Sequence, residues 1–465
     1  MRSIAAACWT GLSLAILASA EPALAGDTFI LATGRRDPRI YAIDFKAALR
    51  TPNDRTPNAI VSRSKVQADR LDGTPLGDPA NIVLSEDRRT AYVINHHGAI
   101  DNAAFLQHGG RGSVSVMDVR KMIDRHFDNT DAALEQSFDS GYFGGVGLLV
   151  LPKVLLVSHS ENWLTEDGSN RISLIDRRTG SRVGQIEMAL GHPGHACPAF
   201  PVPFVSPTPP PVVPFLAPDP GFGCWPNPEF IAIGNGSDGR SYLFSGNAGT
   251  EDVAVMDLQA ALAGVPVVEV APRIPVQSGP FGIKASPNGK LIAVTARESA
   301  KIDFEGNTIS IIDVDRARTG APGAELARVR VGTDDPAGQA RPFTLAWTPD
   351  GRAIVVANYR TNNVSIVDVR RALAHDPHAE VARIPVTRLM DPDGIVRPGN
   401  PKGTAITSDG RYAVVSGGPR LDPSFPPSGT VWVIDLQKRE VIATVTGVGN
   451  DPYGLTILED ADRPE

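Results

Sequence analysis

The sequence predicts an all-β, seven-bladed β-propeller whose ring is closed by N- and C-terminal strands in one blade. Three observations predict it: a hairpin unit that recurs along the chain, a regular spacing between the recurrences, and an incomplete unit at each end. The presence of 45 glycines and 40 prolines among 465 residues is consistent with a fold rich in turns.

The recurring unit consists of a proline, a short apolar strand, a polar turn and a second apolar strand. Three segments show it clearly: GPFGIKASPNGKLIAVTA from Gly279, RPFTLAWTPDGRAIVVAN from Arg341 and NPKGTAITSDGRYAVVSG from Asn400. Their Asn-Gly and Asp-Gly turns are hairpin signals, because glycine supplies the positive φ that these turns require. A fourth segment, GDPANIVLSEDRRTAYVIN from Gly77, carries Ser-Glu-Asp-Arg at the turn.

Each unit continues with a third strand of alternating residues, such as NNVSIVDVR or GTVWVIDLQ, and then with a fourth strand. The prolines that open four units are 62, 59 and 51 residues apart, at Pro280, Pro342, Pro401 and Pro452. Four strands that recur at this spacing predict propeller blades. The first strands, such as FGIKA and GTAIT, are expected to line the central channel with small and apolar residues.

The two chain ends complement each other. DTFILATGRRDPRIYAIDF near the N-terminus matches a second and third strand, and NDPYGLTILED near the C-terminus matches a first strand. Pairing them completes one blade and removes an open sheet edge. Seven blades are then expected, although the irregular blade near Gly144 leaves six or eight open; they start near Pro79, Gly144, Pro228, Pro280, Pro342, Pro401 and Pro452. Short links that begin with Asp, such as DFKAALR and DVRRALA, predict capped helical turns after the third strands.

The N-terminus and the composition predict an exported protein. One arginine, an apolar stretch and Ala-Leu-Ala predict a signal peptide over residues 1–25, and the remaining 26–465 a single propeller domain. We therefore expect a periplasmic or secreted protein with no membrane span after cleavage. In an oxidising compartment, Cys197 and Cys224 are expected to form a disulfide at the base of a Pro-rich insertion at about 197–226. A net charge of −7 without a basic cluster argues against nucleic acid as a partner.

The repeat resembles that of a known family. IVVANYRTNNVSIVDV is similar to the YVTN repeat of β-propellers, through Val356, Ala357, Asn358, Asn363, Val364, Ser365, Ile366, Val367 and Asp368. The resemblance covers nearly all of the mature chain, in the manner of periplasmic YncE-like proteins and lactonase-like seven-bladed propellers. It implies the fold, whereas one propeller fold supports many activities.

One face of the predicted ring, the loop-rich face, carries the loops between second and third strands and the links between blades. Histidines of three consecutive regions lie there, and neutral imidazoles can bind a divalent metal such as Cu or Zn. The candidate metal ligands are His96, His159, His192 and His195. The alternative is that these are exposed or hydrogen-bonded loop residues, because their spacing matches no sharp metal motif.

Arginines follow the second strands of several blades and predict a site for carboxylate or phosphate groups. They are Arg35, Arg36, Arg297, Arg360 and Arg420. Ion pairs between blades, with acids such as Glu298 and Asp451, are an equally weighted alternative. The full set of candidate ligand-binding residues is Arg36, Asn95, His96, Arg297, Asn358, Tyr359, Arg360 and Tyr453.

The lactonase-like resemblance implies hydrolysis by an activated water, with His159 or Glu298 as the candidate catalytic base. A serine nucleophile of the G-x-S-x-G type is absent from the sequence. The sequence therefore favours an exported propeller that binds a small ligand or a protein partner at its loop-rich face. The alternative is a lactonase-like or metal-dependent periplasmic enzyme that uses the same face.

Overall fold

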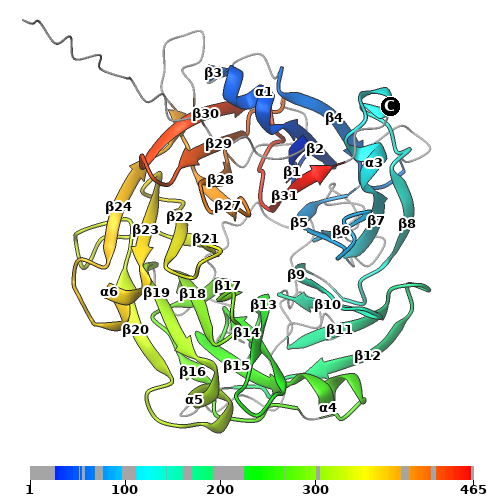
Figure 1. Ribbon diagram of the computed structural model, residues 1–465. Coiled ribbons are helices and arrows are strands. Elements are labelled where there is room, and N and C mark those ends of the chain that lie inside the picture. The colour runs from blue at the N-terminus through cyan, green and yellow to red at the C-terminus, as the bar shows by residue number, and fades with distance from the viewer. Residues whose placement is uncertain are drawn as a thin grey trace, which may run out of the picture.

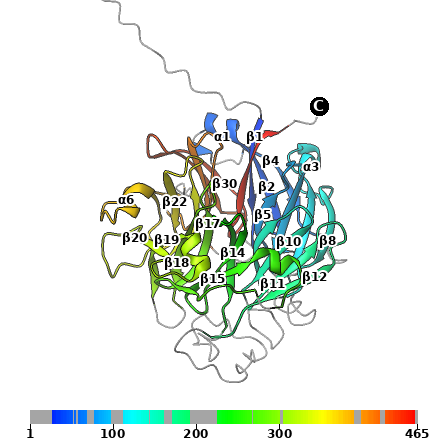
Figure 2. The same ribbon diagram turned by 60° about the horizontal axis from the view of Figure 1, so that its bottom comes forward.

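The computed structural model describes residues 27–51, 53–54, 58–68, 77–96, 112–142, 144–160, 170–191, 225–266, 268–299, 304–388, 397–419 and 426–461. Their strands form seven blades around a central axis, and the chain passes around the ring once (Figure 1). The tilted view shows the strands standing upright along that axis (Figure 2). The predicted all-β, seven-bladed propeller is confirmed.

We number the blades from the one that joins the chain ends. Blade 1 contains β31 (Leu455–Ala461), β1 (Asp27–Thr33), β2 (Arg39–Asp44) and β4 (Ile60–Lys65). Blade 2 contains β5 (Pro79–Leu84), β6 (Thr90–Asn95), β7 (Ser113–Asp118) and β8 (Leu134–Asp139). Blade 3 contains β9 (Gly145–Val150), β10 (Val154–His159), β11 (Arg171–Asp176) and β12 (Arg182–Glu187). Blade 4 contains β13 (Pro228–Asn235), β14 (Ser241–Asn247), β15 (Asp252–Asp257) and β16 (Ile274–Pro275).

The remaining blades follow the same order from the channel outward. Blade 5 contains β17 (Gly279–Ala285), β18 (Leu291–Glu298), β19 (Glu305–Asp313) and β20 (Glu325–Arg330). Blade 6 contains β21 (Pro342–Trp347), β22 (Ala353–Asn358), β23 (Asn363–Asp368) and β24 (Glu380–Pro385). Blade 7 contains β27 (Pro401–Ile406), β28 (Tyr412–Gly417), β29 (Thr430–Asp435), β30 (Glu440–Thr446) and β3 (Asn53–Asp54). A two-stranded hairpin, β25 (Thr387–Arg388) and β26 (Arg397–Pro398), precedes blade 7.

Blade 1 closes the ring as predicted. β1 pairs antiparallel with β31, with Ile30 opposite Ile457, and the red end of the chain lies beside its blue start (Figure 1). A second connection was not predicted: β3, from the chain of blade 1, adds to β30 as a parallel fifth strand of blade 7. Blades 1 and 7 are therefore joined by main-chain hydrogen bonding as well as by packing.

Turn chemistry explains the hairpins. Gly289, Gly351 and Gly410 have φ near 70° in the turns after β17, β21 and β27, as their Asn-Gly and Asp-Gly sequences require. In the turn after β5, Arg88 takes the same left-handed conformation at φ 59°. The Ser-Glu-Asp-Arg sequence therefore folds like the other turns, with a strained residue where they have glycine.

The third strands end in aspartates that cap short helices, as predicted for four blades. The helices are α1 (Phe45–Arg50), α3 (Val119–Met122), α4 (Leu258–Leu262), α5 (Val314–Thr319) and α6 (Val369–Leu373), and a 3-10 turn, η1 (Arg125–Phe127), follows α3. The side chain of Asp368, for example, accepts a hydrogen bond from Arg371 N at 2.9 Å. Helix α5 was not predicted; its sequence VDRART lacks the Ala-Leu pair that α1, α4 and α6 share.

The direction of the strands defines two faces. Each first strand starts at the loop-rich face and ends at the opposite one, which carries the hairpin turns and the short helices and is called the hairpin face below. The hydrophobic core lies in layers between neighbouring blades: Ile309 and Ile311 of blade 5, for example, pack with Ile354 and Val356 of blade 6. No helix among the described residues has the length and apolar character needed to cross a membrane.

Hydroxyl groups tie several blades to the next near the axis. Thr295 Oγ1 of β18 donates to Phe343 O of β21 at 2.9 Å, and Ser416 Oγ of β28 donates to Tyr453 O at 3.1 Å. Gly282 faces the same neighbour so closely that a Cβ there would lie 2.8 Å from Phe343 O. Only glycine permits this approach, which keeps the first strands tightly arranged around a narrow channel.

Candidate functional site

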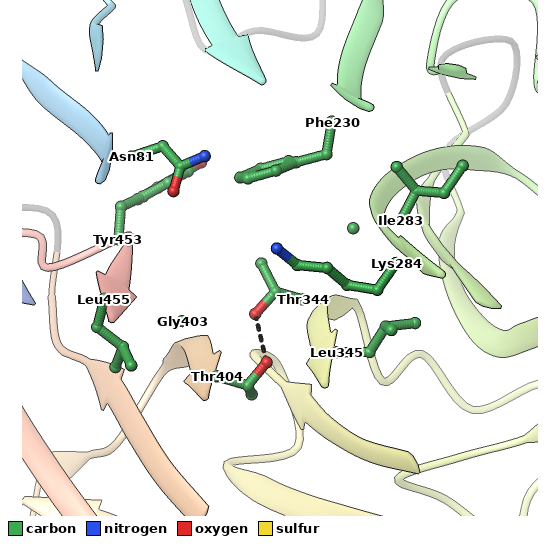
Figure 3. A pocket seen from close by; sticks show the side chains of 12 residues that line it. Asn81, Phe230, Ile283, Lys284, Thr344, Leu345, Gly403, Thr404, Tyr453 and Leu455 are labelled. Carbon is green, nitrogen blue, oxygen red and sulfur yellow. Dashed lines mark hydrogen bonds between the residues drawn. The ribbon is translucent and has the colours of Figure 1, made fainter. Parts of the chain in front are cut away.

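A cavity lies in the central channel between the first strands of six blades. Its volume is about 380 Å³, open solvent space included. Its walls combine apolar side chains, two threonines, one amide and one lysine (Figure 3). The lining residues are Asn81, Phe230, Gly282, Ile283, Lys284, Thr344, Leu345, Gly403, Thr404, Tyr453, Gly454 and Leu455. We call this the channel cavity.

Strand register places the channel cavity along the axis. Most of its walls are the second to fourth residues after the proline that opens a first strand, such as Gly282 to Lys284 after Pro280. Of the first residues after these prolines, Tyr453 lines it, whereas Phe281, Phe343 and Lys402 do not. Because first strands run away from the loop-rich face, the channel cavity lies on the hairpin-face side of Phe281 and Phe343.

Aromatic rings meet across the channel on the loop-rich side. Tyr453 of blade 1 contacts Phe343 of blade 6 with ring centroids 4.9 Å apart and Phe281 of blade 5 at 5.8 Å. Phe281 also contacts Phe230 and Phe343, at 5.1 and 4.5 Å. Tyr359 packs against Phe343 at 5.9 Å. We call these five residues the aromatic layer; it covers the channel cavity toward the loop-rich face.

Arg297 lies over the aromatic layer, 4.2 Å from the Phe281 centroid. Its guanidinium is 2.6 Å from a Glu298 oxygen and 3.6 Å from a Glu229 oxygen. Burial is the largest influence on its pKa and lowers it, but the two carboxylates together hold the pKa of Arg297 above its ordinary value. Arg297 is thus a charged group that is already compensated within the protein.

The other cations of the loop-rich centre also have acidic partners. Arg341 lies 2.6 Å from Glu298 and 3.0 Å from Glu305, and the largely exposed Arg360 lies 2.8 Å from Glu305. Arg35 lies 3.0 Å from Asp78 and 4.7 Å from the Tyr453 centroid.

The buried Lys402 pairs with the buried Asp451 and donates to Gly418 O at 3.0 Å. Of the other predicted arginines, Arg36 is half-buried after β1 and Arg420 lies outside the described residues. The ion pairs that the sequence left open therefore form in the described part of this face.

Lys284 differs from all of these cations. It extends from β17 into the channel cavity, where water reaches it, and among the described residues no carboxylate lines the cavity with it. Its surroundings still remove enough solvent that burial lowers the pKa of the Lys284 ammonium, with no charged described residue offsetting the effect. The only other titrating residue that lines the channel cavity is Tyr453, whose pKa burial raises to about 12.

Three predicted site residues share one structural position at the end of a second strand. Asn95 Nδ2 donates to Ser115 Oγ at 2.9 Å, Asn358 Nδ2 donates to Ser365 Oγ at 2.7 Å, and His159 Nε2 lies 2.9 Å from Ser173 Oγ. All three side chains are fully buried. Each therefore binds the third strand of its own blade, and contact of these residues with a ligand, a metal or a substrate stays a prediction.

His96 is also buried, and its Nδ1 lies 3.2 Å from Gly145 O of the next blade. Among the described residues, no three His, Cys, Asp or Glu side chains are grouped as a metal site requires. Several predictions lie outside the described residues: the signal peptide, His192 and His195, and the disulfide between Cys197 and Cys224 within the Pro-rich insertion. The predicted domain limits stay a prediction too.

The structure brings together some predicted residues and adds others. Arg297, Tyr359 and Tyr453 all contact Phe343, whereas Glu298 lies between two arginines; that they form a ligand site stays a prediction. Sequence reasoning missed Lys284 and Lys402, because it took the first strands to carry small and apolar residues. Aligning the residues that follow each proline would have found Lys402 beside Phe281, Phe343 and Tyr453 in one register.

The fold and this channel define a seven-bladed β-propeller with lactonase-like structural neighbours. The periplasmic gluconolactonase PpgL of Pseudomonas aeruginosa is similar, with a TM-score of 0.56, 15% identity and coverage of 94% of this chain and 99% of that one. A protein of Bacteroides uniformis proposed to be a 6-phosphogluconolactonase has a TM-score of 0.54 and 13% identity over 93% and 99% of the two chains.

Hydrazine synthase of Kuenenia stuttgartiensis is similar as well, with a TM-score of 0.50, 15% identity and coverage of 86% of this chain and 89% of that one. No protein-family model and no curated protein matches the sequence. At these identities the likeness establishes the fold, and proteins with different names share it.

Proposed function

We propose that this chain is a ligand-binding β-propeller that takes a small organic molecule into its channel cavity. The observation that carries the proposal is the mixed lining of that cavity: Phe230 and Leu455 offer apolar surface, and Asn81 and Lys284 offer polar groups. Small-molecule sites typically combine a mostly apolar concave surface with a few placed polar groups. A rigid ring of blades holds these groups in fixed positions.

Main-chain groups add to the proposed site. Each first strand is the inner edge of its blade and has no neighbouring strand on the channel side. Edge strands present N–H and C=O groups that are free to bind. Several of these groups already bind a neighbouring blade, as Phe343 O, Lys402 O and Tyr453 O do through hydroxyls, so only the remaining ones can bind a ligand that the side chains orient.

We also propose that the protein is exported and acts in the periplasm. The predicted signal peptide and the similarity to PpgL, a periplasmic gluconolactonase, support this location. The resemblance to YVTN and YncE-like propellers is part of the same proposal. Expression of the full chain with a fractionation of cells would test it: a mature form that begins after residue 25 in the periplasmic fraction is expected.

The binding proposal is tested with a cavity-filling variant. Thr404→Trp places a large ring in the channel cavity, and Ser408→Trp places the same ring on the exposed turn of the same blade. In a thermal-shift screen of small organic molecules, hits that stabilise wild type should stabilise Ser408→Trp and not Thr404→Trp. Hits that stabilise both variants equally would place binding elsewhere and contradict the proposal.

Lactone hydrolysis is the second candidate, because two structural neighbours carry lactonase names. The described geometry disfavours both predicted catalytic bases. His159 is enclosed within blade 3, and Glu298 lies 2.6 Å from both Arg297 and Arg341. An arginine-bound carboxylate is a weak base. Hydrolysis of glucono-δ-lactone by wild type, His159→Ala and Glu298→Gln would decide it; rates equal to the uncatalysed reaction in all three would exclude it.

A further inference from the structure

We infer that the ligand of the channel cavity is a small hydroxylated monocarboxylate whose carboxylate binds Lys284. This inference rests on the proposed function, because it names the chemical class that the channel cavity takes. Four properties of the cavity carry it: an uncompensated cation, a donating amide, an accepting hydroxyl pair and apolar walls.

The cation requires a single negative charge. Arg297, Arg35 and Lys402 each have a carboxylate partner, whereas none of the described residues provides one to Lys284. Figure 3 shows the ammonium end of Lys284 directed toward the middle of the channel cavity. A partly desolvated cation favours an anion that replaces its lost solvation, and one carboxylate balances its charge.

The charged groups around Lys284 are otherwise satisfied. On the first strands, Glu229 lies beside Arg297, and Lys402 beside Asp451. At the end of β31, the Glu459 carboxylate accepts from Ser408 N at 2.8 Å, and Asp460 is exposed. A second negative charge on the ligand would therefore lack a partner in the channel cavity.

The hydroxyl pair requires a hydrogen-bond donor. Thr344 Oγ1 donates its proton to Lys402 O, so the 3.1 Å contact between the two threonine hydroxyls uses the proton of Thr404 (Figure 3). Each hydroxyl has one proton and two acceptor positions. Thr404 Oγ1 therefore offers lone pairs to the channel cavity and can accept from a ligand hydroxyl.

The amide and the apolar walls complete the match. Asn81 Oδ1 accepts from Ile82 N at 2.9 Å, which leaves the NH₂ group of Asn81 to donate to a ligand oxygen. Phe230 and Leu455 offer surface for a short hydrocarbon chain. A ligand with a carboxylate, a hydroxyl and a few methylene groups can bind the ammonium, the hydroxyl and amide groups, and the apolar walls of the channel cavity together.

The test uses three compounds of similar size that differ in one group each. They are 3-hydroxybutyrate, butyrate, which lacks the hydroxyl, and 1,3-butanediol, which lacks the charge. Isothermal titration calorimetry at neutral pH should show 3-hydroxybutyrate as the tightest. Lys284→Met should weaken it at least tenfold, the loss expected for a charge-assisted hydrogen bond, whereas Lys284→Arg should retain most of the affinity.

Lys290→Met is the matched control, since Lys290, in the next turn of the same blade, lies outside the channel cavity and donates to Asn235 O and Gly236 O. Its affinity for 3-hydroxybutyrate should equal that of wild type. Affinity should also fall as the pH rises through the lowered pKa of Lys284, because the neutral amine cannot balance a carboxylate.

Two outcomes would overturn the inference. If 1,3-butanediol binds wild type as tightly as 3-hydroxybutyrate and Thr404→Trp abolishes both, the channel cavity binds small molecules but does not select anions. If Lys284→Met binds 3-hydroxybutyrate like wild type, or if wild type binds none of the three compounds, the assigned ligand class is wrong. In those cases the proposed function is decided by its own screen with Thr404→Trp and Ser408→Trp.

Discussion

Lys284 and Lys402 stand on first strands of different blades, and their ammonium groups meet opposite surroundings. Lys402 is almost fully enclosed and binds Asp451, whereas Lys284 lies in a recess that water enters and has no acidic partner among the described residues. A paired buried cation supports the folded state only while its partner remains. Lys284 is exposed to the water in this recess, and partial removal of solvent lowers its pKa with no charged described residue to offset the effect.

The lowered pKa of Lys284 predicts how stability depends on pH. Between this folded-state pKa and the ordinary lysine value of 10.5, the unfolded chain binds more protons than the folded one, so stability gains from Lys284 as pH rises through this window. Lys284→Met removes the unfavourable charge and should raise the unfolding temperature at neutral pH. The gain should shrink as the pH approaches 10.5.

Differential scanning calorimetry of wild type and Lys284→Met across this pH range would check the prediction. Lys290→Met provides the comparison, because it removes a lysine charge from the same blade outside the channel cavity. A constant difference between wild type and Lys284→Met at all pH values would show that the charge of Lys284 does not affect the folded state.

At the scale of elements, a buried polar side chain links the second and third strands of several blades. Asn95 and Asn358 hold serines of the third strand, and His159 does so in blade 3. The YVTN-like asparagine thus fixes where the loop between these strands begins. A loop of any length can follow it, because the strand pair is already joined before the chain leaves the blade.

Asn358→Ala should lower the free energy of unfolding by about 1–3 kcal/mol, since it leaves the buried partners Asn363 and Ser365 without a donor. Arg360→Ala, on the same loop, removes a largely exposed ion pair and should cost less than about 1 kcal/mol. Urea unfolding monitored by fluorescence would compare them. Equal effects of the two changes would contradict the structural role given to Asn358.

The sequence was sufficient to predict elements whose signals are local. Prolines mark the first strands, Asn-Gly and Asp-Gly mark the hairpins, and a terminal aspartate marks the short helices, so the blades and their limits could be predicted. The pairing of β3 with β30 could not, because a two-residue parallel strand has no periodicity to recognise. This pairing forms only because the folded blades 1 and 7 place β3 beside β30.

The candidate site was less predictable for a similar reason. Arg297 and Tyr453 were named from their positions in loops, but their partners come from other blades and are fixed only by the ring. Lys284 was overlooked because FGIKA is one apolar strand by pattern. Whether this lysine has an acidic partner depends on the first strands of the six other blades. Those strands are far from Lys284 in the sequence, so a local pattern cannot show them.

At the scale of the whole molecule, closure of the ring by β1 and β31 predicts a test of architecture. Deleting residues 455–461 leaves β1 as an open edge and removes the first strand of blade 1. This variant should lose cooperative thermal unfolding and should aggregate. Calorimetry and light scattering would detect both effects.

A circular permutant provides the matched control. Asp27 and Ala461 are paired partners, so a short linker can join the two ends, and new ends can be opened at the turn residues 349–351 between β21 and β22. This permutant keeps every strand pair and should unfold close to the wild-type temperature. If it unfolds as the deletion variant does, closure at blade 1 has a role beyond strand pairing.

The pairing of β1 with β31 also determines when the ring can close during synthesis and folding. The first strand to be synthesised receives its last partner only after nearly the whole chain has followed, so ring closure is a late, long-range step. A product that ends early retains an exposed β1 edge, which is open to aggregation and proteolysis. We therefore expect chains that lack β31 to be degraded by proteases faster than chains that contain it.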